Sequence, residues 1–110
     1  DVEVMRDDAA RARGLMFRRH MAADHGMLFD FEQDQPVTMW MKNTYLPLDM
    51  VFIRPDGTIS RIAADTEPLS TAIISSGGPV LAVLELNAGT AAKLGIAPGD
   101  RIEHAMFKAR

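Results

Sequence analysis

An indole, a cation and a carboxylate stand at a spacing that could place them together on one surface. They are Trp40, Lys42 and Asp49. If residues 36–43 and 47–54 pair as a hairpin about the turn between them, Lys42 faces Asp49 and Trp40 lies beside them. Such a surface could stack against a polar ligand through the indole and hydrogen-bond to it through the charged groups.

The opposite side of the same hairpin is predicted to be core. Four apolar side chains would meet there in two cross-strand pairs, and a shift of one residue in the register would exchange the two sides. These residues are Met39, Met41, Met50 and Phe52. Two interpretations of the Trp40 side stay open. It is either the wall of a ligand groove or a rim on which Lys42 and Asp49 form an exposed ion pair, worth under about 1 kcal/mol.

Glu85 is a second polar residue out of pattern. It lies in the apolar run 80–86, on the same side of the expected strand as Val83. A buried carboxylate needs a partner, and Arg13 and Arg18 are the candidates in this chain. A structural ion pair and a ligand site both fit this pattern.

Three functional hypotheses follow. The first is a non-catalytic module that binds a small polar or sugar-like ligand in a groove. Its walls would be the indole side of the hairpin together with Asn43, and Arg18 would lie at its floor or edge with Glu85. The second is a hydrolase that uses Asp49 and Glu85 as acid and base, as glycosidases use two carboxyls. The third is a protein-interaction domain that uses a strand edge or the loop 65–79.

The composition excludes several kinds of site. The chain has no cysteine, so disulfides, thiolate nucleophiles and cysteine metal sites are absent. Its three histidines have no metal-ligand spacing, and its eight methionines are better explained as core filling, so we expect no metal and no cofactor. A formal net charge of -3 gives no attraction to nucleic acid. No apolar run approaches the roughly 20 residues of a membrane-spanning helix.

The elements that must position these residues are mostly short strands. Alternating apolar and polar residues, short apolar runs and frequent turn sequences recur along the 110 residues. This pattern predicts a single mainly-β domain over residues 1–110, a small antiparallel β-barrel or jelly-roll-like sandwich with one or two short helices. The expected strands are 2–4, 26–31, 36–43, 47–54, 58–64, 80–86 and 101–108, and the expected helices run from residue 7 or 8 toward residue 16 and over 88–94.

Several motifs, in order along nearly the whole chain, are similar to those of one family. They are Arg13-Gly14-Leu15-Met16-Phe17-Arg18, Gly26-Met27-Leu28-Phe29, Trp40-Met41-Lys42-Asn43-Thr44, Pro47-Leu48-Asp49, Leu84-Glu85, Gly95-Ile96 and Pro98-Gly99-Asp100-Arg101. On these motifs the chain resembles the bacterial and archaeal family called domain of unknown function 192. The resemblance implies a small β-barrel or jelly-roll-like fold, and it supplies no established reaction, cofactor or partner.

The resemblance also points to polar positions and to a location. The polar residues that recur in the family match Arg13, Arg18, Trp40, Lys42, Asn43, Asp49 and Glu85. Many relatives carry an N-terminal export signal, and this chain already opens on the strand-like alternation of Val2 and Val4. We therefore expect an extracytoplasmic location, in the periplasm or cell envelope, after removal of a signal.

Overall fold

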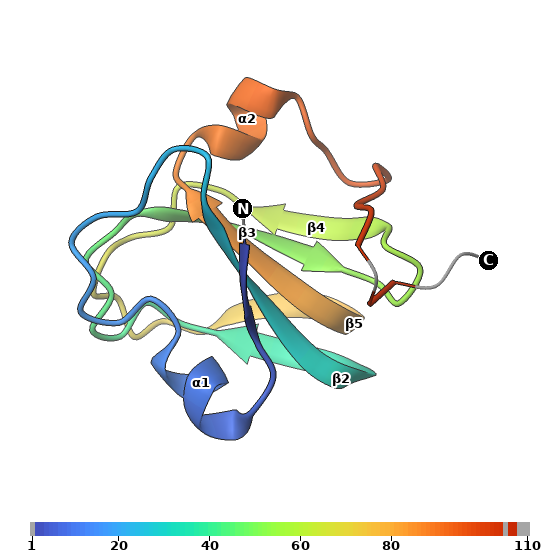
Figure 1. Ribbon diagram of the computed structural model, residues 1–110, viewed down its shortest axis with the longest axis horizontal. Helices are drawn as coiled ribbons and strands as arrows, with labels where there is room; N and C mark the ends of the chain where they lie inside the picture. The colour runs from blue at the N-terminus through green and yellow to red at the C-terminus, as the bar shows by residue number, and fades with distance from the viewer. Residues whose placement is uncertain (1, 105, 108–110) are drawn as a thin grey trace.

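Within the part of the chain that the computed structural model describes, residues 2–104 and 106–107, five strands form one mixed sheet (Figure 1). The strand order is β1-β2-β5-β3-β4, and every pair is antiparallel except β1 with β2. The two short helices lie at opposite ends of the view in Figure 1. The elements are β1 (Val2–Met5), α1 (Asp8–Arg13), β2 (Gly26–Met39), β3 (Leu48–Ile53), β4 (Ile59–Ala63), β5 (Ile74–Asn87) and α2 (Thr90–Leu94).

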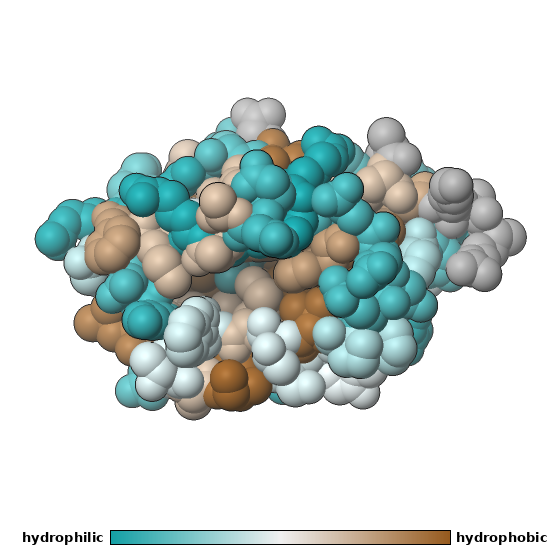
Figure 2. Space-filling view, turned by 90° about the horizontal axis from the view of Figure 1, so that it is seen from below, coloured by the Kyte–Doolittle hydropathy of each residue, from teal (hydrophilic) through white to brown (hydrophobic). Residues whose placement is uncertain are grey.

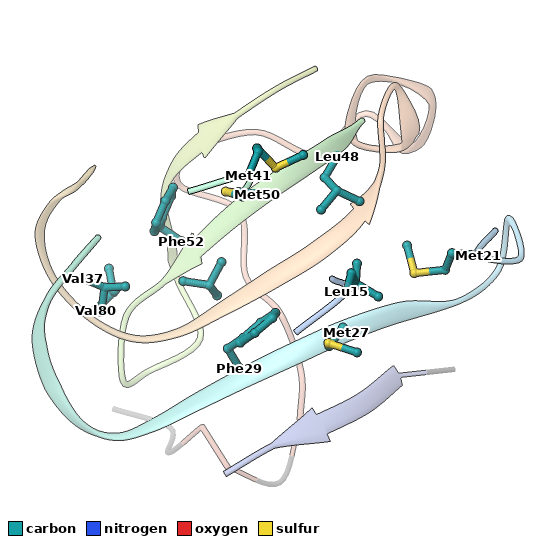
Figure 3. Packing of buried hydrophobic residues seen from close by; sticks show 11 residues of the cluster. Leu15, Met21, Met27, Phe29, Val37, Met41, Leu48, Met50, Phe52 and Val80 are labelled. Atoms are coloured by element: carbon teal, nitrogen blue, oxygen red, sulfur yellow. The ribbon is translucent and has the colours of Figure 1, made fainter. Parts of the chain in front are cut away.

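The two long strands, β2 and β5, bend as they pair. Their register shifts between Asp30 and Gln35 and again between Pro36 and Thr38. Glu32 has a φ of 66° there, and its backbone N–H donates to the Asp30 carboxylate at 2.8 Å. Such register shifts are typical of β-bulges, in which extra residues in one strand bend it and increase its twist. The sheet therefore curls around the side chains on one of its faces (Figure 3).

Apolar side chains fill both faces of the sheet. We name the two sets by what covers them. The α1-side cluster gathers side chains of β2, β3 and β5 with Leu15 from the segment after α1 (Figure 3), and the C-terminal-side cluster packs against Ile96, Ile102, Met106 and Phe107. β3 is buried along its whole length because Met50 and Phe52 enter the first cluster while Val51 and Ile53 enter the second. Each such side chain contributes about 1.5–3 kcal/mol by leaving water.

The predicted hairpin of residues 36–43 with 47–54 is wrong. β2 ends at Met39, residues 40–47 form a connection, and β3 pairs with β4 and β5 instead of β2. The core prediction for the apolar side agrees with the structure, since Met41, Met50 and Phe52 share the α1-side cluster and Met39 packs against it.

The mainly-β class is confirmed, with 43% of the described residues in strands or isolated bridges. The sheet is strongly curved but does not close, so it resembles a barrel only loosely. Two expected strands, 26–31 and 36–43, contribute to the single strand β2. Of the expected strand 101–108, Arg101 forms an isolated bridge with Thr58, and residues 105 and 108 lie outside the described residues.

Candidate functional site

A cavity of about 230 Å³ opens between α1, β2 and the connection that follows β2. Figure 2 views the molecule from the side of α1 and shows apolar residues recessed between hydrophilic ones near the middle of this face. We call the cavity between α1, β2 and this connection the Trp40–Glu85 cavity. Its lining residues are Arg11, Ala12, Arg13, Gly14, Leu15, Met16, Phe29, Phe31, Thr38, Met39, Trp40, Thr44 and Glu85.

Trp40 stands at this cavity because its two neighbours are held in the core. Met41 is buried, and its backbone N–H donates to the carbonyl of Ser70 at 2.9 Å. Met39 packs against the same cluster. Successive side chains of an extended chain point to opposite sides, so the indole is directed outward and stays 43% exposed. The Lys42 ammonium lies 5.1 Å from the centre of the indole ring.

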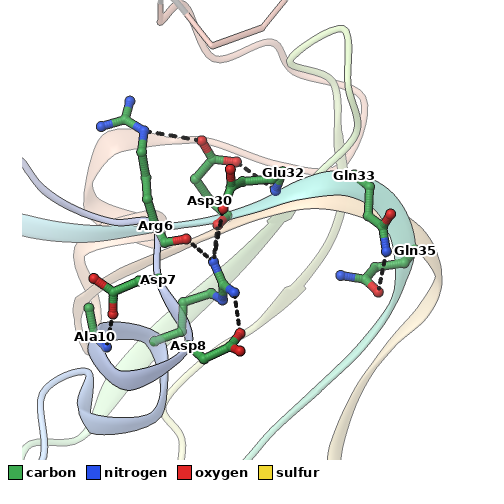
Figure 4. A network of polar contacts seen from close by, with 9 residues as sticks. Arg6, Asp7, Asp8, Ala10, Asp30, Glu32, Gln33 and Gln35 are labelled. Carbon is green, nitrogen blue, oxygen red and sulfur yellow. Dashed lines mark hydrogen bonds and ion pairs between the residues drawn. The ribbon is translucent and has the colours of Figure 1, made fainter.

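The start of α1 is fixed to β2 by a polar network (Figure 4). Asp7 caps the helix by accepting a hydrogen bond from the backbone N–H of Ala10 at 2.7 Å. The Arg11 guanidinium donates to Asp8 at 2.6 Å, to the carbonyl of Asp30 at 3.0 Å and to the carbonyl of Arg6. A helix of six residues has little stability of its own, so these contacts hold it over the cavity.

The end of α1 reaches the cavity through a close approach at Gly14. A Cβ atom there would lie 2.9 Å from the Phe29 ring, so only glycine permits this contact. Beyond it, the backbone N–H of Phe17 donates to the carbonyl of Asn43 at 2.8 Å. Asn43 has a φ of 56°, a conformation that asparagine tolerates better than most residues. These contacts place Arg13 beside the segment that carries Trp40.

A second, outer hollow continues from the cavity across Arg13 and Trp40. It is lined by Ala9, Ala12, Arg13, Met16, Phe17, Trp40, Lys42 and Asn43. Ala12, Arg13, Met16 and Trp40 line both hollows, so the two adjoin, and we call the cavity the deep part and the outer hollow the mouth. Five of the seven residues predicted from the sequence line these two hollows: Arg13, Trp40, Lys42, Asn43 and Glu85.

Glu85 forms the floor of the deep part. It lies between Met27 of β2 and Met50 of β3, and the residue is 4% exposed. No hydrogen bond or ion pair reaches its carboxyl group from any described residue. No described side-chain polar atom is both sealed from solvent and unpartnered, so the carboxyl oxygens must open to the cavity. Burial among apolar side chains raises the pKa of Glu85 to about 8.

Asp49 lies on the other face of the sheet. In the β3–β5 register Met50 is opposite Glu85 and Asp49 is opposite Leu86, so the two carboxyls point to opposite faces. Asp49 is 1% exposed and accepts two hydrogen bonds of 2.9 Å, from the backbone N–H groups of Asp65 and Ala91. This separation leaves no shared cleft in which Asp49 and Glu85 could act as an acid and base pair.

Arg18 is likewise engaged away from the cavity. Its guanidinium donates to both carboxylate oxygens of Glu3, at 2.6 and 2.9 Å, and His25 lies 3.0 Å from the same carboxylate. The hydrogen bond from Arg18, followed by that from His25, lowers the pKa of Glu3 to about 2. These three side chains, which we call the Glu3 group, connect β1 to the segment between α1 and β2.

The Glu3 group predicts a pH-dependent contribution to stability. Because its pKa is lowered on folding, the contribution is fully present above the ordinary glutamate pKa and is lost as the pH falls through about 2. Glu3→Gln should lower the free energy of unfolding by about 1 kcal/mol at pH 7, since the ion pair is partly exposed. Urea unfolding at pH 7 and at pH 2.5 checks this, with the exposed Glu67→Gln as the control. An equal loss at both pH values would contradict it.

Most lining residues of the cavity, Phe29, Phe31 and Thr38 among them, were not singled out as site residues from the sequence. Phe29 and Phe31 alternate along β2 and form an apolar wall, and Thr38 precedes Trp40 by two residues. Because Thr38 and Trp40 are two positions apart in an extended segment, their side chains lie on the same side, and the sequence could have indicated Thr38 as a site residue in this way.

Among the described residues, no group of three or more histidine, aspartate and glutamate side chains is placed to hold a metal ion.

Comparison with known proteins assigns the chain to a family. The family model of domain of unknown function 192, described as an uncharacterized ACR, matches residues 1–104. The chain belongs to this family, as its motifs predict.

It matches no curated protein. No helix in the described part of the chain is long and apolar enough to cross a membrane.

Two crystal structures are similar to the chain over most of its length. One is a protein of Sinorhizobium meliloti 1021, provisionally described as a transcription regulator, with 60% sequence identity and a TM-score of 0.94. The similarity covers 96% of this chain and 82% of that one. The other is a protein of unknown function from Novosphingobium aromaticivorans DSM 12444, with 43% identity and a TM-score of 0.91. It covers 94% of this chain and 74% of that one.

Proposed function

We propose that the chain is a non-catalytic binding module whose Trp40–Glu85 cavity takes one small, polar, sugar-sized ligand. The observation that carries the proposal is the Glu85 carboxyl, which is buried and without a partner in the described residues. Buried polar groups are almost always hydrogen-bonded, so such a group calls for a partner from outside the chain. Water takes that place in the free protein, and a ligand hydroxyl takes it in the complex.

The size and walls of the cavity support a ligand the size of a monosaccharide. A volume of about 230 Å³ corresponds to roughly eight water molecules. That is less than the usual range for drug-sized ligands. The indole of Trp40 offers a flat face for the apolar side of a sugar ring, while Thr38 and Glu85 offer polar groups.

Neither the helices nor the charge of this chain favours the role of transcription regulator that describes the Sinorhizobium relative. α1 has six residues and α2 has five, and both are short for a helix that reads the major groove of DNA. The formal net charge of -3 also gives no general attraction to phosphate.

Trp40 provides the test, because the chain has one tryptophan and its fluorescence therefore reports on this residue alone. We expect at least one member of a panel of monosaccharides and their acid and amine derivatives to change the emission of Trp40 in a saturable way. Glu85→Leu should weaken that binding roughly tenfold, because it removes the polar group that the ligand meets. The exposed Glu67→Gln is the matched control and should bind as the unmodified chain does.

Two results would reject the binding module. One is the absence of a saturable response to every compound in the panel. The other is a Glu85→Leu variant that binds as tightly as the unmodified chain.

The alternative function, a protein-interaction domain, would use the sheet edges β1 and β4. Size-exclusion chromatography with light scattering tests it by measuring the mass of any complex that the chain forms in native extract.

We also propose that the module acts outside the cytoplasm, on the ground of the family's export signals. Fractionation of cells that express the native gene, followed by immunodetection of the chain, tests this location. Recovery with the cytoplasmic fraction would reject it.

A further inference from the structure

We infer that the ligand of the Trp40–Glu85 cavity is an acidic monosaccharide, with its hydroxyl groups at Glu85 and its anionic group at Arg13 and Lys42 in the mouth. This inference rests on the proposed function and names the class of ligand for the same site. It follows from the distribution of charge over the two hollows, which differs from that of the chain as a whole.

The ionisable residues that line the cavity and the outer hollow are three cations and one carboxyl group. They are Arg11, Arg13, Lys42 and Glu85. The whole chain has 15 acidic and 12 basic residues, so an excess of cations over carboxyl groups along these two hollows is a local departure from the chain's charge. Opposite charge at a binding surface favours the matching ligand and rejects the wrong one.

The three cations are not equally available to a ligand. Arg11 is occupied by Asp8, by the carbonyl of Asp30 and by Glu32, whose carboxylate lies 3.6 Å away. No described carboxylate lies within ion-pair distance of Arg13 or Lys42. Both residues are exposed, and both line the outer hollow. An anionic group in the mouth therefore meets two cations that no described carboxylate neutralises.

Glu85 does not oppose an anion in this position. Met27 and Met50 flank Glu85 from the neighbouring strands, and the other charged residues that line the same cavity are Arg11 and Arg13. Burial keeps the pKa of Glu85 at about 8, so its carboxyl group is mainly protonated at neutral pH. A protonated carboxyl group donates one hydrogen bond and accepts others, which suits a neutral sugar hydroxyl.

Trp40 links the two ends of the site. The indole lines both hollows, and Lys42 already lies over its ring. A sugar ring stacked on the indole would extend from the deep part toward the mouth, with its hydroxyl groups inward and its acidic substituent outward. A cationic substituent in the same position would be repelled by Arg13 and Lys42.

Three pyranoses of similar size test the inference: glucuronate, glucose, and the glucose derivative whose primary hydroxyl is replaced by an ammonium group. We expect glucuronate to bind roughly tenfold more tightly than glucose, and the ammonium derivative to bind most weakly, as measured by Trp40 fluorescence at pH 7 and low salt. Arg13→Gln should remove most of the preference for glucuronate over glucose. Arg13→Lys should restore part of the preference, since it keeps the charge.

The matched control is Arg54→Gln, an exposed arginine in the turn before β4, which should leave all three affinities unchanged. Arg13 is exposed and unpaired in the described residues, so its replacement should also leave the unfolding temperature unchanged. Equal affinities for glucuronate and glucose, or a preference for the ammonium derivative, would overturn the acidic-ligand inference and leave the binding module standing. If the unmodified chain responds to no compound of the larger panel, the proposed function falls and the inference falls with it.

Discussion

Replacing Glu85 with glutamine should make the protein more stable at pH 7, by on the order of 3 kcal/mol in the free energy of unfolding. The reason is that the Glu85 carboxyl is buried without a partner, and its pKa is raised from 4.5 to about 8. Between these pH values the unfolded chain gives up the proton while the folded chain keeps it. Folding stability attributable to Glu85 is therefore fully present below pH 4.5 and falls as the pH rises toward 8.

Urea unfolding at several pH values distinguishes a stability change that comes from the raised pKa of Glu85 from one that does not depend on pH. We expect Glu85→Gln and the unmodified chain to have similar stability at pH 4, and their difference to grow steadily to pH 8. Glu67→Gln, which removes an exposed carboxylate, should show no such trend. A difference between Glu85→Gln and the unmodified chain that is constant with pH, or a loss of stability at pH 7, would show that Glu85 is ionised and well solvated in the folded protein.

Replacing Asp49 with alanine should have the opposite effect, a loss on the order of 3 kcal/mol in the free energy of unfolding at pH 7. The substitution leaves the N–H groups of Asp65 and Ala91 without the carboxylate oxygens that now accept from them. Buried donors that lose a partner cost about 1–3 kcal/mol each. Hydrogen exchange of the Asp65 and Ala91 amides should also become faster, because both are protected through Asp49.

The binding properties of Asp49→Ala distinguish a structural role from a ligand-binding one. Because Asp49 lies on the face opposite Glu85, the folded variant should give the same Trp40 fluorescence response as the unmodified chain. The control is Asp34→Asn, an exposed carboxylate in the β2 segment, which should change neither stability nor binding. A variant of Asp49 that keeps its stability but loses the ligand response would place Asp49 in the binding site after all.

The sequence predicted the chemistry of the site better than its geometry. Alternation along the chain correctly separated Met41, which is buried, from Trp40, which is exposed. It could not decide which strand lies beside which, because the pairing of β3 with β5 joins segments more than 20 residues apart. The apolar pattern of β3 is the same whether its partner strand is β2 or β5. The sequence pattern therefore favoured the short hairpin with the preceding segment, which is the wrong pairing.

The positions of Asp49 and Glu85 could not be predicted for the same reason. Their side chains point to opposite faces only because Met50, not Asp49, is in register with Glu85. The contact of Gly14 with Phe29, which brings Arg13 to the cavity, also depends on how α1 packs on the sheet. Family motifs named these residues together, but the structure is what separates Arg18 and Asp49 from the other five.

The most direct measurement is the titration of the Glu85 side-chain carboxyl carbon by NMR, with and without glucuronate. We predict a pKa near 8 in the free protein and a further rise when glucuronate is bound, because a sugar hydroxyl that accepts a hydrogen bond from the protonated carboxyl group stabilises the protonated form. A carboxyl group that titrates like an ordinary glutamate, and that ignores glucuronate while Trp40 responds to it, would contradict a ligand site built on Glu85.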